Sequence, residues 1–267
     1  MVATAANAAV YMQNFDGFPD GTTVLGDGST ISSNDVTNSV QSTALRMTQD
    51  GVNSTWSSFR IPSLMGSSSG WVATFDFSLA DAQDNFSPAD GFSFNYGAIP
   101  ALTSPGTFTG AGEGNGEEGF NAGGGGNFAN LSFEVDTWTN GFGENGYNIA
   151  LQGPGADSNL AFQNTDILLD GGTLLGSAVL SWNPIDGASM SIDSGGGLVA
   201  IFSNFATPGF TGLDSYSFAF SARTGGANET LTIDNIVIST QFVPEPATLA
   251  LLGVALAGLS FSRRKLH

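Results

Sequence analysis

Two acidic residues separated by a single position are the groups in this sequence best placed to do chemistry. Glu134 and Asp136 lie in the segment 131–140, and Trp138 and Asn140 follow at the same spacing. If this segment is extended, Glu134, Asp136 and Trp138 share one face, because successive side chains of a strand alternate. Two such carboxylates can converge on one or two hard cations, and Asn140 and a backbone carbonyl would add the neutral oxygens that calcium prefers. The pattern predicts a calcium site; the alternative is an acidic, solvated strand edge that binds no metal.

The residues that would position these carboxylates follow the pattern of short strands. In the segment 71–79 the odd positions are apolar and most even positions are polar, and the aromatic residues of 92–96 and 216–220 alternate in the same way. Strands with one apolar face predict two antiparallel sheets packed face to face. We therefore expect one all-β sandwich, with no amphipathic helix before the C-terminal tail.

The composition restricts the classes of function open to this chain. Gly contributes 37 residues, Phe contributes 21, and only 11% of residues are charged, which suits many short strands around an aromatic core. The formal net charge is −18, and half of the six basic residues lie at 263–265, so the acidic body would repel nucleic acid. There is no Cys, and the only His is His267, which excludes thiol chemistry and His-dependent catalysis from the folded body.

The C-terminal end carries a separate signal. Pro244, Glu245 and Pro246 precede the uncharged apolar run 247–261, and a basic cluster follows at 263–265. This order predicts a hydrophobic transmembrane helix with the basic cluster on the cytoplasmic side. It resembles the PEP-CTERM sorting signal, which implies export in a Gram-negative bacterium and processing by an exosortase at Pro-Glu-Pro. A plain membrane anchor is the alternative.

We divide the chain into three parts on this basis. Residues 1–9 are small and Ala-rich, as at the end of a signal peptide or in a disordered N-terminus. Residues 10–240 form the sandwich, and residues 241–267 form the sorting tail. The resemblance implies that the tail holds the protein in the membrane before processing, after which the protein lies at the cell surface or outside the cell.

The segment 131–140 resembles the metal-binding strand and loop of L-type (legume-type) lectins, which reads Glu-x-Asp-Thr-aromatic-x-Asn. Further resemblances occur in the order of that family: Pro-Ala-Asp-Gly at 88–91, the Gly-rich run 123–126, and the late strand and loop at 218–225. In the family, the Asp of the first motif, here Asp90, follows a cis peptide bond and receives sugar hydroxyls. The resemblance implies a concanavalin-like antiparallel β-sandwich (jelly roll), here followed by the C-terminal hydrophobic helix.

The metal site departs from the family pattern at two positions. The family's His falls at Asn148, and its second acid falls near Gly143, with Glu144 one residue away. Transition metals normally need an imidazole, so manganese is not expected. Glu134 would support a second ion or form a hydrogen bond to the loop. The calcium ligands implied by the resemblance are Asp136, the Trp138 carbonyl, Asn140 and Glu144.

The resemblance also implies a sugar site. Asp90 would accept two sugar hydroxyls, and hydrogen bonds to its charged carboxylate are the stronger contacts. The Asn140 amide and the backbone of the Gly-rich loop would donate, the Trp138 ring would offer a stacking surface, and Arg223 lies in the late loop that flanks the site. The expected sugar-binding residues are Asp90, Gly124, Gly125, Trp138, Asn140 and Arg223.

We therefore expect an exported lectin-like protein that binds a glycan or extracellular polysaccharide. Laminarinase-type hydrolases share the fold, but they need a second Glu after Asp136, where Trp138, Thr139 and Asn140 stand, so an enzyme is not expected. The other alternative is a structural protein of the extracellular matrix or a biofilm, with a lectin fold but no working sugar site, because fold alone does not determine function. The two differ in whether Asp90, Asn140 and the loop 123–126 converge on one open concavity or are covered by the Gly-rich segment 97–119.

Overall fold

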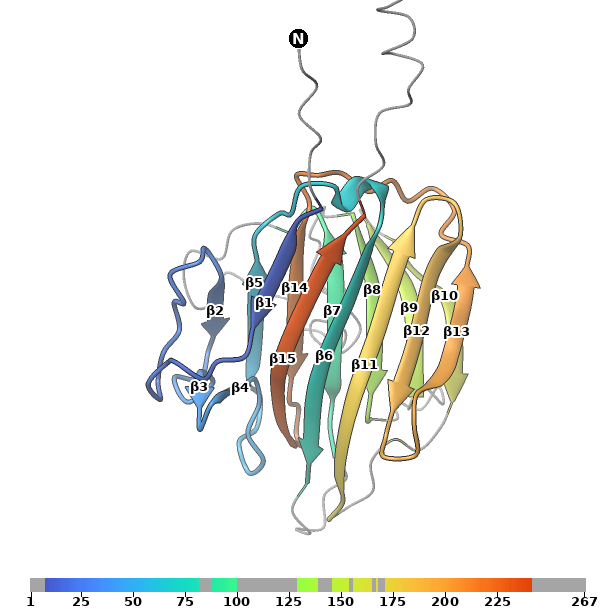
Figure 1. The fold of residues 1–267 in the computed structure, drawn as a ribbon. Coiled ribbons are helices and arrows are strands. Elements are labelled where there is room, and N and C mark those ends of the chain that lie inside the picture. The colour runs from blue at the N-terminus through green and yellow to red at the C-terminus, as the bar shows by residue number, and fades with distance from the viewer. Residues whose placement is uncertain are drawn as a thin grey trace, which may run out of the picture.

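In a computed structural model, the body of the chain folds into two antiparallel β-sheets that lie face to face (Figure 1). The structure describes residues 8–81, 88–99, 129–138, 146–153, 156–164, 167 and 171–241. The expected all-β sandwich is therefore confirmed for these residues. The C-terminal hydrophobic helix of the prediction lies outside them.

The larger sheet contains eight strands in the order β13-β12-β11-β6-β15-β4-β3, and β1 also pairs with β15. Because β1 runs antiparallel to β15, with Val10 opposite Ser239, the first and last described strands lie side by side. The bounds of these strands are β1 Val10–Gln13, β3 Val40–Gln41, β4 Ala44–Arg46, β6 Trp71–Ala80, β11 Thr173–Asn183, β12 Gly187–Asp193, β13 Val199–Phe205 and β15 Thr230–Thr240.

The smaller sheet contains seven strands in the order β10-β9-β8-β7-β14-β5-β2. The strand that carries the paired acids, β8, is an interior strand with β7 on one side and β9 on the other. The bounds of these strands are β2 Thr30–Ser33, β5 Trp56–Ile61, β7 Gly91–Gly97, β8 Asn130–Asp136, β9 Gly146–Gly153, β10 Ala156–Asn164 and β14 Ser217–Arg223. A short 3-10 helix, η1, spans Ser67–Ser69 before β6.

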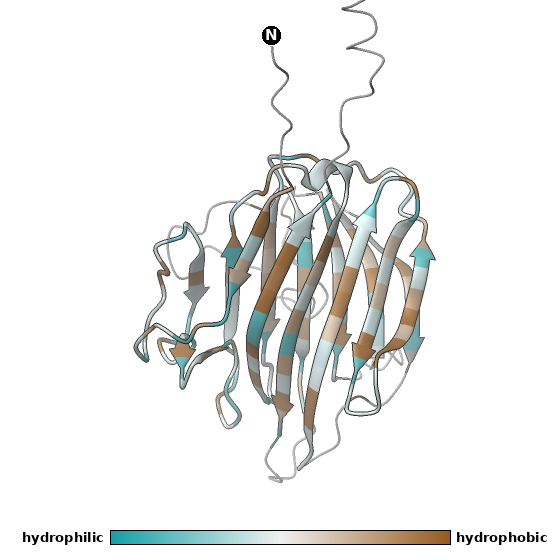
Figure 2. Cartoon of the chain, viewed as in Figure 1, coloured by the Kyte–Doolittle hydropathy of each residue, from teal (hydrophilic) through white to brown (hydrophobic). Residues whose placement is uncertain are grey.

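The alternation read from the sequence is realised in the strands. In β6 every second residue from Trp71 to Leu79 is buried, and the residues between them are partly exposed. Figure 2 shows the resulting change between apolar and polar positions along the strands of the larger sheet. The buried side chains of the two sheets face each other and form one continuous hydrophobic core.

Aromatic rings fill the centre of this core. The Trp71 ring is fully buried, and its centroid lies 5.4 Å from that of Phe218 in the opposite sheet. The Phe75 and Phe220 rings meet edge to face at 4.8 Å. Each such pair contributes about 0.5–1.5 kcal/mol beyond the burial of its area, so the Phe-rich composition supports a rigid interface between the sheets. Other rings within 6 Å of Trp71 belong to Phe94, Tyr96 and Phe133.

No helix among the described residues is long and apolar enough to cross a membrane.

Candidate functional site

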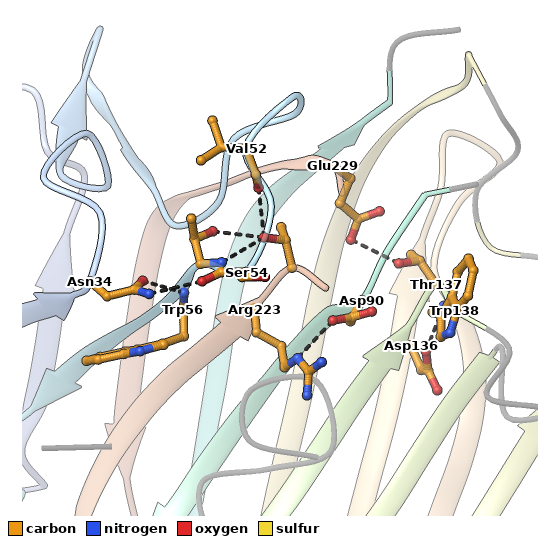
Figure 3. Close-up of polar contacts among 12 residues, drawn as sticks. Asn34, Val52, Ser54, Trp56, Asp90, Asp136, Thr137, Trp138, Arg223 and Glu229 are labelled. Atoms are coloured by element: carbon orange, nitrogen blue, oxygen red, sulfur yellow. Dashed lines mark hydrogen bonds and ion pairs between the residues drawn. The ribbon is translucent and has the colours of Figure 1, made fainter. Parts of the chain in front are cut away.

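The ends of adjacent strands bring several predicted site residues together. The register places Arg223 at the end of β14 opposite Gly91 at the start of β7, and Gly91 opposite Asp136 at the end of β8. Asp90 immediately precedes Gly91, and Trp138 follows Asp136 by two residues. Asp90, Asp136, Trp138 and Arg223 therefore gather at one end of the seven-stranded sheet (Figure 3).

Asp90 is fixed by its backbone on both sides. The Ala89–Asp90 peptide bond is cis, as the family resemblance implies. The Asp90 N–H donates to the Arg223 carbonyl at 3.2 Å, and the Asp90 carbonyl accepts from the Thr137 N–H at 3.3 Å. The turn that carries Asp90 is thus tied both to the end of β14 and to the segment after β8.

The Asp90 carboxylate forms an ion pair with Arg223. The Arg223 Nε lies 2.8 Å from Asp90 Oδ2, and the two side chains are 19% and 7% exposed, respectively. A hydrogen bond between charged groups in so sheltered a place is stronger than a neutral one. The ion pair therefore orients the carboxylate at the edge of the site.

Gly91 is required by the close approach of β8 to this turn. Its φ is +106°, and a Cβ atom at this position would lie 2.1 Å from the Val135 carbonyl oxygen. Any side chain would both strain the backbone and collide with β8. Gly91 thus allows the turn that carries the Asp90 carboxylate to pack closely against the end of β8.

The paired acids on β8 lie on the face opposite the core, as their spacing predicts, but they are not solvated. Glu134 and Asp136 are 2% and 5% exposed on an interior strand, so they are not solvent-exposed as the metal-free alternative expected. Asn148 on β9 is opposite Glu134, and its Nδ2 donates to Glu134 Oε2 at 2.7 Å. Asp136 Oδ1 accepts the Trp138 N–H at 2.8 Å, which turns the chain after β8.

The donor chemistry of these residues suits a hard cation better than a transition metal. Asp136 offers carboxylate oxygens, and carboxylate and carbonyl oxygens are the ligands that calcium prefers. Asn148, at the position of the family's His, directs its Nδ2 at Glu134 and supplies no imidazole nitrogen. Within the described ranges, no three Asp, Glu, His or Cys side chains group closely enough to hold a metal ion. Asn140 and Glu144 lie outside those ranges.

A further acid, which the sequence pattern did not single out, adjoins the site through Thr137. Glu229, just before β15, is 1% exposed, and its Oε1 accepts the Thr137 hydroxyl at 3.0 Å. Burial, helped by the nearby Asp90 and Asp81 carboxyls, raises the pKa of Glu229 to about 8, against the lowering effect of hydrogen bonds from Thr137 and the Gly91 backbone. Glu229 is therefore largely protonated at neutral pH. The only sequence signal was an acid placed directly before an alternating apolar strand.

Of the remaining predicted positions, only Trp138 lies in the described part of the chain. Trp138 is described and is partly buried beside Asp136. The Gly-rich loop residues Gly124 and Gly125, the amide donor Asn140, the acid Glu144 and the processing residues Pro244, Glu245 and Pro246 are not among the described residues.

Comparison with known proteins identifies the tail and the fold separately. The model of the PEP-CTERM protein-sorting motif matches residues 242–265, which confirms the resemblance read from the tail. This motif indicates export of the chain. A comparison with the curated proteins finds no match for the sequence.

Among solved structures, the body is similar to legume lectins. Peanut lectin, in a structure with a 9mer peptide, aligns at a TM-score of 0.62 and 17% identity over 89% of this chain and 100% of that one. The seed lectin of Lotus tetragonolobus aligns at 0.59 and 14% identity over 90% and 100%. The exoplasmic/lumenal domain of VIP36, in its Ca²⁺/Man-bound form, aligns at 0.59 and 14% identity over 89% and 91%. These similarities confirm the concanavalin-like fold, so the chain combines a lectin-like domain with an export signal.

Proposed function

We propose that the lectin-like domain binds carbohydrate at a site centred on Asp90. The observation that carries this proposal is the fixed carboxylate: two backbone hydrogen bonds and the Arg223 ion pair hold it at the strand ends. A preorganised carboxylate can accept two neighbouring hydroxyls of a sugar ring without first losing freedom of its own. This is the role that the L-type lectin resemblance implies for Asp90.

The surrounding residues would complete the site in the proposed complex. Trp138 is partly buried, and its backbone N–H donates to Asp136. Its ring would present a surface for an apolar sugar face. Asn140 and the backbone N–H groups of Gly124 and Gly125 would donate to further hydroxyls. A single shallow site of this kind binds at about millimolar affinity, or roughly 4 kcal/mol. Many copies on one surface would raise the effective affinity through avidity.

Calcium is the cation that we propose for the adjacent loop. Asp136, the Trp138 carbonyl, Asn140 and Glu144 are its proposed ligands, and calcium would order the segment that carries Trp138 and Asn140. Glu134 would play a supporting part through its bond with Asn148. Manganese is not proposed, because the position that should supply an imidazole is an amide.

For the tail, we propose that the hydrophobic helix anchors the protein in the membrane until an exosortase acts at Pro244, Glu245 and Pro246. The protein would then lie on the surface of a Gram-negative cell or in the extracellular matrix, where its partner is a glycan or polysaccharide. Nucleic acid is not a proposed partner, since the net charge of −18 opposes it.

Binding without hydrolysis is the activity proposed. A retaining glycoside hydrolase needs two carboxyl groups on either side of the scissile bond. No second Glu follows Asp136 at the laminarinase spacing, and Asp90, the carboxylate at the centre of the site, is paired with Arg223.

One observation favours the second candidate, a structural matrix protein without a working sugar site. The Asp90 side chain is only 7% exposed, so a sugar must reach a carboxylate that is already sheltered and ion-paired. In this case the sandwich would serve as a rigid exported scaffold.

A polysaccharide and glycan array separates the two candidates. The purified protein is applied as wild type, as Asp90→Asn and as Asp186→Asn, the last being the same chemical change at an exposed turn between β11 and β12. Binding that is lost only in Asp90→Asn supports the proposed site. Binding that survives in Asp90→Asn places the sugar elsewhere, and no binding by the wild type favours the matrix protein.

A further inference from the structure

Glu229 is a buried carboxyl group that the proposed sugar site does not use directly. Glu229 immediately precedes β15 of the eight-stranded sheet. Its side chain contacts Thr137, which immediately follows β8 of the other sheet and is 92 residues away in sequence. The Glu229 side chain is 1% exposed, and burying a carboxyl group is costly unless it is hydrogen-bonded or neutral.

Thr137 connects Glu229 to both sides of the proposed site. Its hydroxyl donates to Glu229 Oε1 at 3.0 Å, while its N–H donates to the Asp90 carbonyl at 3.3 Å. Its chain neighbours are Asp136 and Trp138, which are joined by their own hydrogen bond. Figure 3 shows Glu229 and Thr137 joined across the gap between the strands, with Asp90 and Trp138 on either side of Thr137.

We propose that Glu229 is a positioning residue for the sugar site. By accepting a hydrogen bond from the Thr137 hydroxyl, it fixes the position of Trp138 relative to the turn that carries Asp90. This inference rests on the proposed function for its consequence, but the structural coupling can be tested without a sugar. Glu229 itself would not contact the sugar, because its side chain is buried.

The charge state of Glu229 controls how well it performs this task. The acidic groups that face it are Asp90 from the turn before β7 and Asp81 from the end of β6, and Arg223 from β14 is paired with Asp90. Burial, together with these two acids, brings the pKa of Glu229 to about 8. Loss of its proton would place a buried negative charge near the Asp90 carboxylate and would push the two segments apart. The site should therefore be ordered at neutral pH and should loosen in mild alkali.

The test follows Trp138 by fluorine NMR. The full chain is labelled with 5-fluorotryptophan, and the Trp138 line is assigned by its loss in Trp138→Phe. The pH is then raised from about 6 to about 10, across the Glu229 pKa of about 8. The lines of Trp56, Trp71 and Trp182 report whether the rest of the fold remains unchanged.

We expect the Trp138 line of the wild type to shift with a midpoint near pH 8, while the lines of the two buried core tryptophans stay in place. Glu229→Gln, which keeps the shape and an acceptor oxygen but cannot ionise, should abolish the shift. Thr137→Val, which removes the link, should also abolish it, and Thr137→Ser should restore it. A wild-type line that does not titrate, or one that titrates equally in Glu229→Gln, would overturn the proposal.

The consequence for binding is measured separately on the polysaccharide that gives the strongest array signal. Thr137→Val should lose about tenfold in affinity at neutral pH, or about 1.4 kcal/mol. The affinity of the wild type should fall as the pH rises through the Glu229 pKa of about 8, whereas that of Glu229→Gln should not follow this pH dependence. If no polysaccharide binds but the Trp138 line behaves as expected, the coupling stands and the proposed function fails. Unchanged affinity in Thr137→Val would contradict a positioning role in binding.

Discussion

Arg223 Nε lies 2.8 Å from Asp90 Oδ2, so the last residue of β14 forms an ion pair with the residue that precedes β7. The same two residues are joined through their backbones, because the Asp90 N–H donates to the Arg223 carbonyl. Both connections are made to a strand, so the Asp90 carboxylate is oriented by the end of β14. Arg223 therefore belongs to the proposed site as the group that orients its acceptor.

Replacing Arg223 by Ala should weaken sugar binding by about tenfold to a hundredfold, which corresponds to roughly 1.5–3 kcal/mol for a hydrogen bond to a charged group. The Asp90 carboxylate would lose the ion pair that helps to orient it. Binding to the immobilised polysaccharide measures the effect. Arg46→Ala is the control, because Arg46 lies on β4 of the other sheet and donates to the Thr37 carbonyl. A gain in affinity would mean instead that Arg223 competes with the sugar for Asp90.

Replacing Gly91 by Ala should destabilise the protein by roughly 2–4 kcal/mol, through a strained φ and a direct clash. The added Cβ would lie 2.1 Å from the Val135 carbonyl oxygen, which neither strand can easily move. Thermal unfolding measures the change. Gly196→Ala is the matched control, because a Cβ there has nothing within 4 Å. Equal melting temperatures for the two variants would show that the strand ends are not packed as described.

The free energy of unfolding should depend on pH through Glu229. Its pKa is about 8 in the folded protein against an ordinary value of 4.5, so between these values the unfolded chain releases a proton that the folded chain keeps. The stability contribution is present below pH 4.5 and is lost as the pH rises through about 8. Compared with wild type, Glu229→Gln should gain relative stability across this window. Parallel stability profiles for the two proteins would contradict a raised pKa.

The sequence predicted the faces of the strands well, because alternation is a local property. The odd residues of 71–79 are buried in β6, and Phe218 and Phe220 lie in the core as expected. The resemblance of short motifs also predicted the cis peptide bond before Asp90 and the position of Asp136 at the end of a strand.

The sequence did not predict the burial of these acids or the role of Glu229. The acids of β8 are buried on an interior strand, and strand order follows from pairings between distant segments. Glu229 meets Thr137 across 92 residues, so no local spacing could indicate the contact. The pairing of Arg223 with Asp90 has the same origin, since β14 and β7 become neighbours only in the folded sheet.

Replacing Asn148 by His should create a response to transition metals that the wild type lacks. An imidazole at this position could keep a hydrogen bond to Glu134 through one nitrogen and offer the other to a metal. We expect Mn²⁺ to raise the melting temperature of Asn148→His and to leave that of the wild type almost unchanged. Calcium serves as the comparison ion for both proteins. A wild type that responds to Mn²⁺ as strongly as to Ca²⁺ would contradict the preference inferred from Asn148.

Titration calorimetry of the best-binding oligosaccharide from the array into wild type and Asp90→Asn tests the central claim most directly. The variant keeps the size of the side chain and removes only the charge that accepts sugar hydroxyls. We expect binding near millimolar affinity for the wild type and no measurable heat for Asp90→Asn, with both proteins equally folded. Equal affinities for the two proteins would show that the sugar is not bound at Asp90.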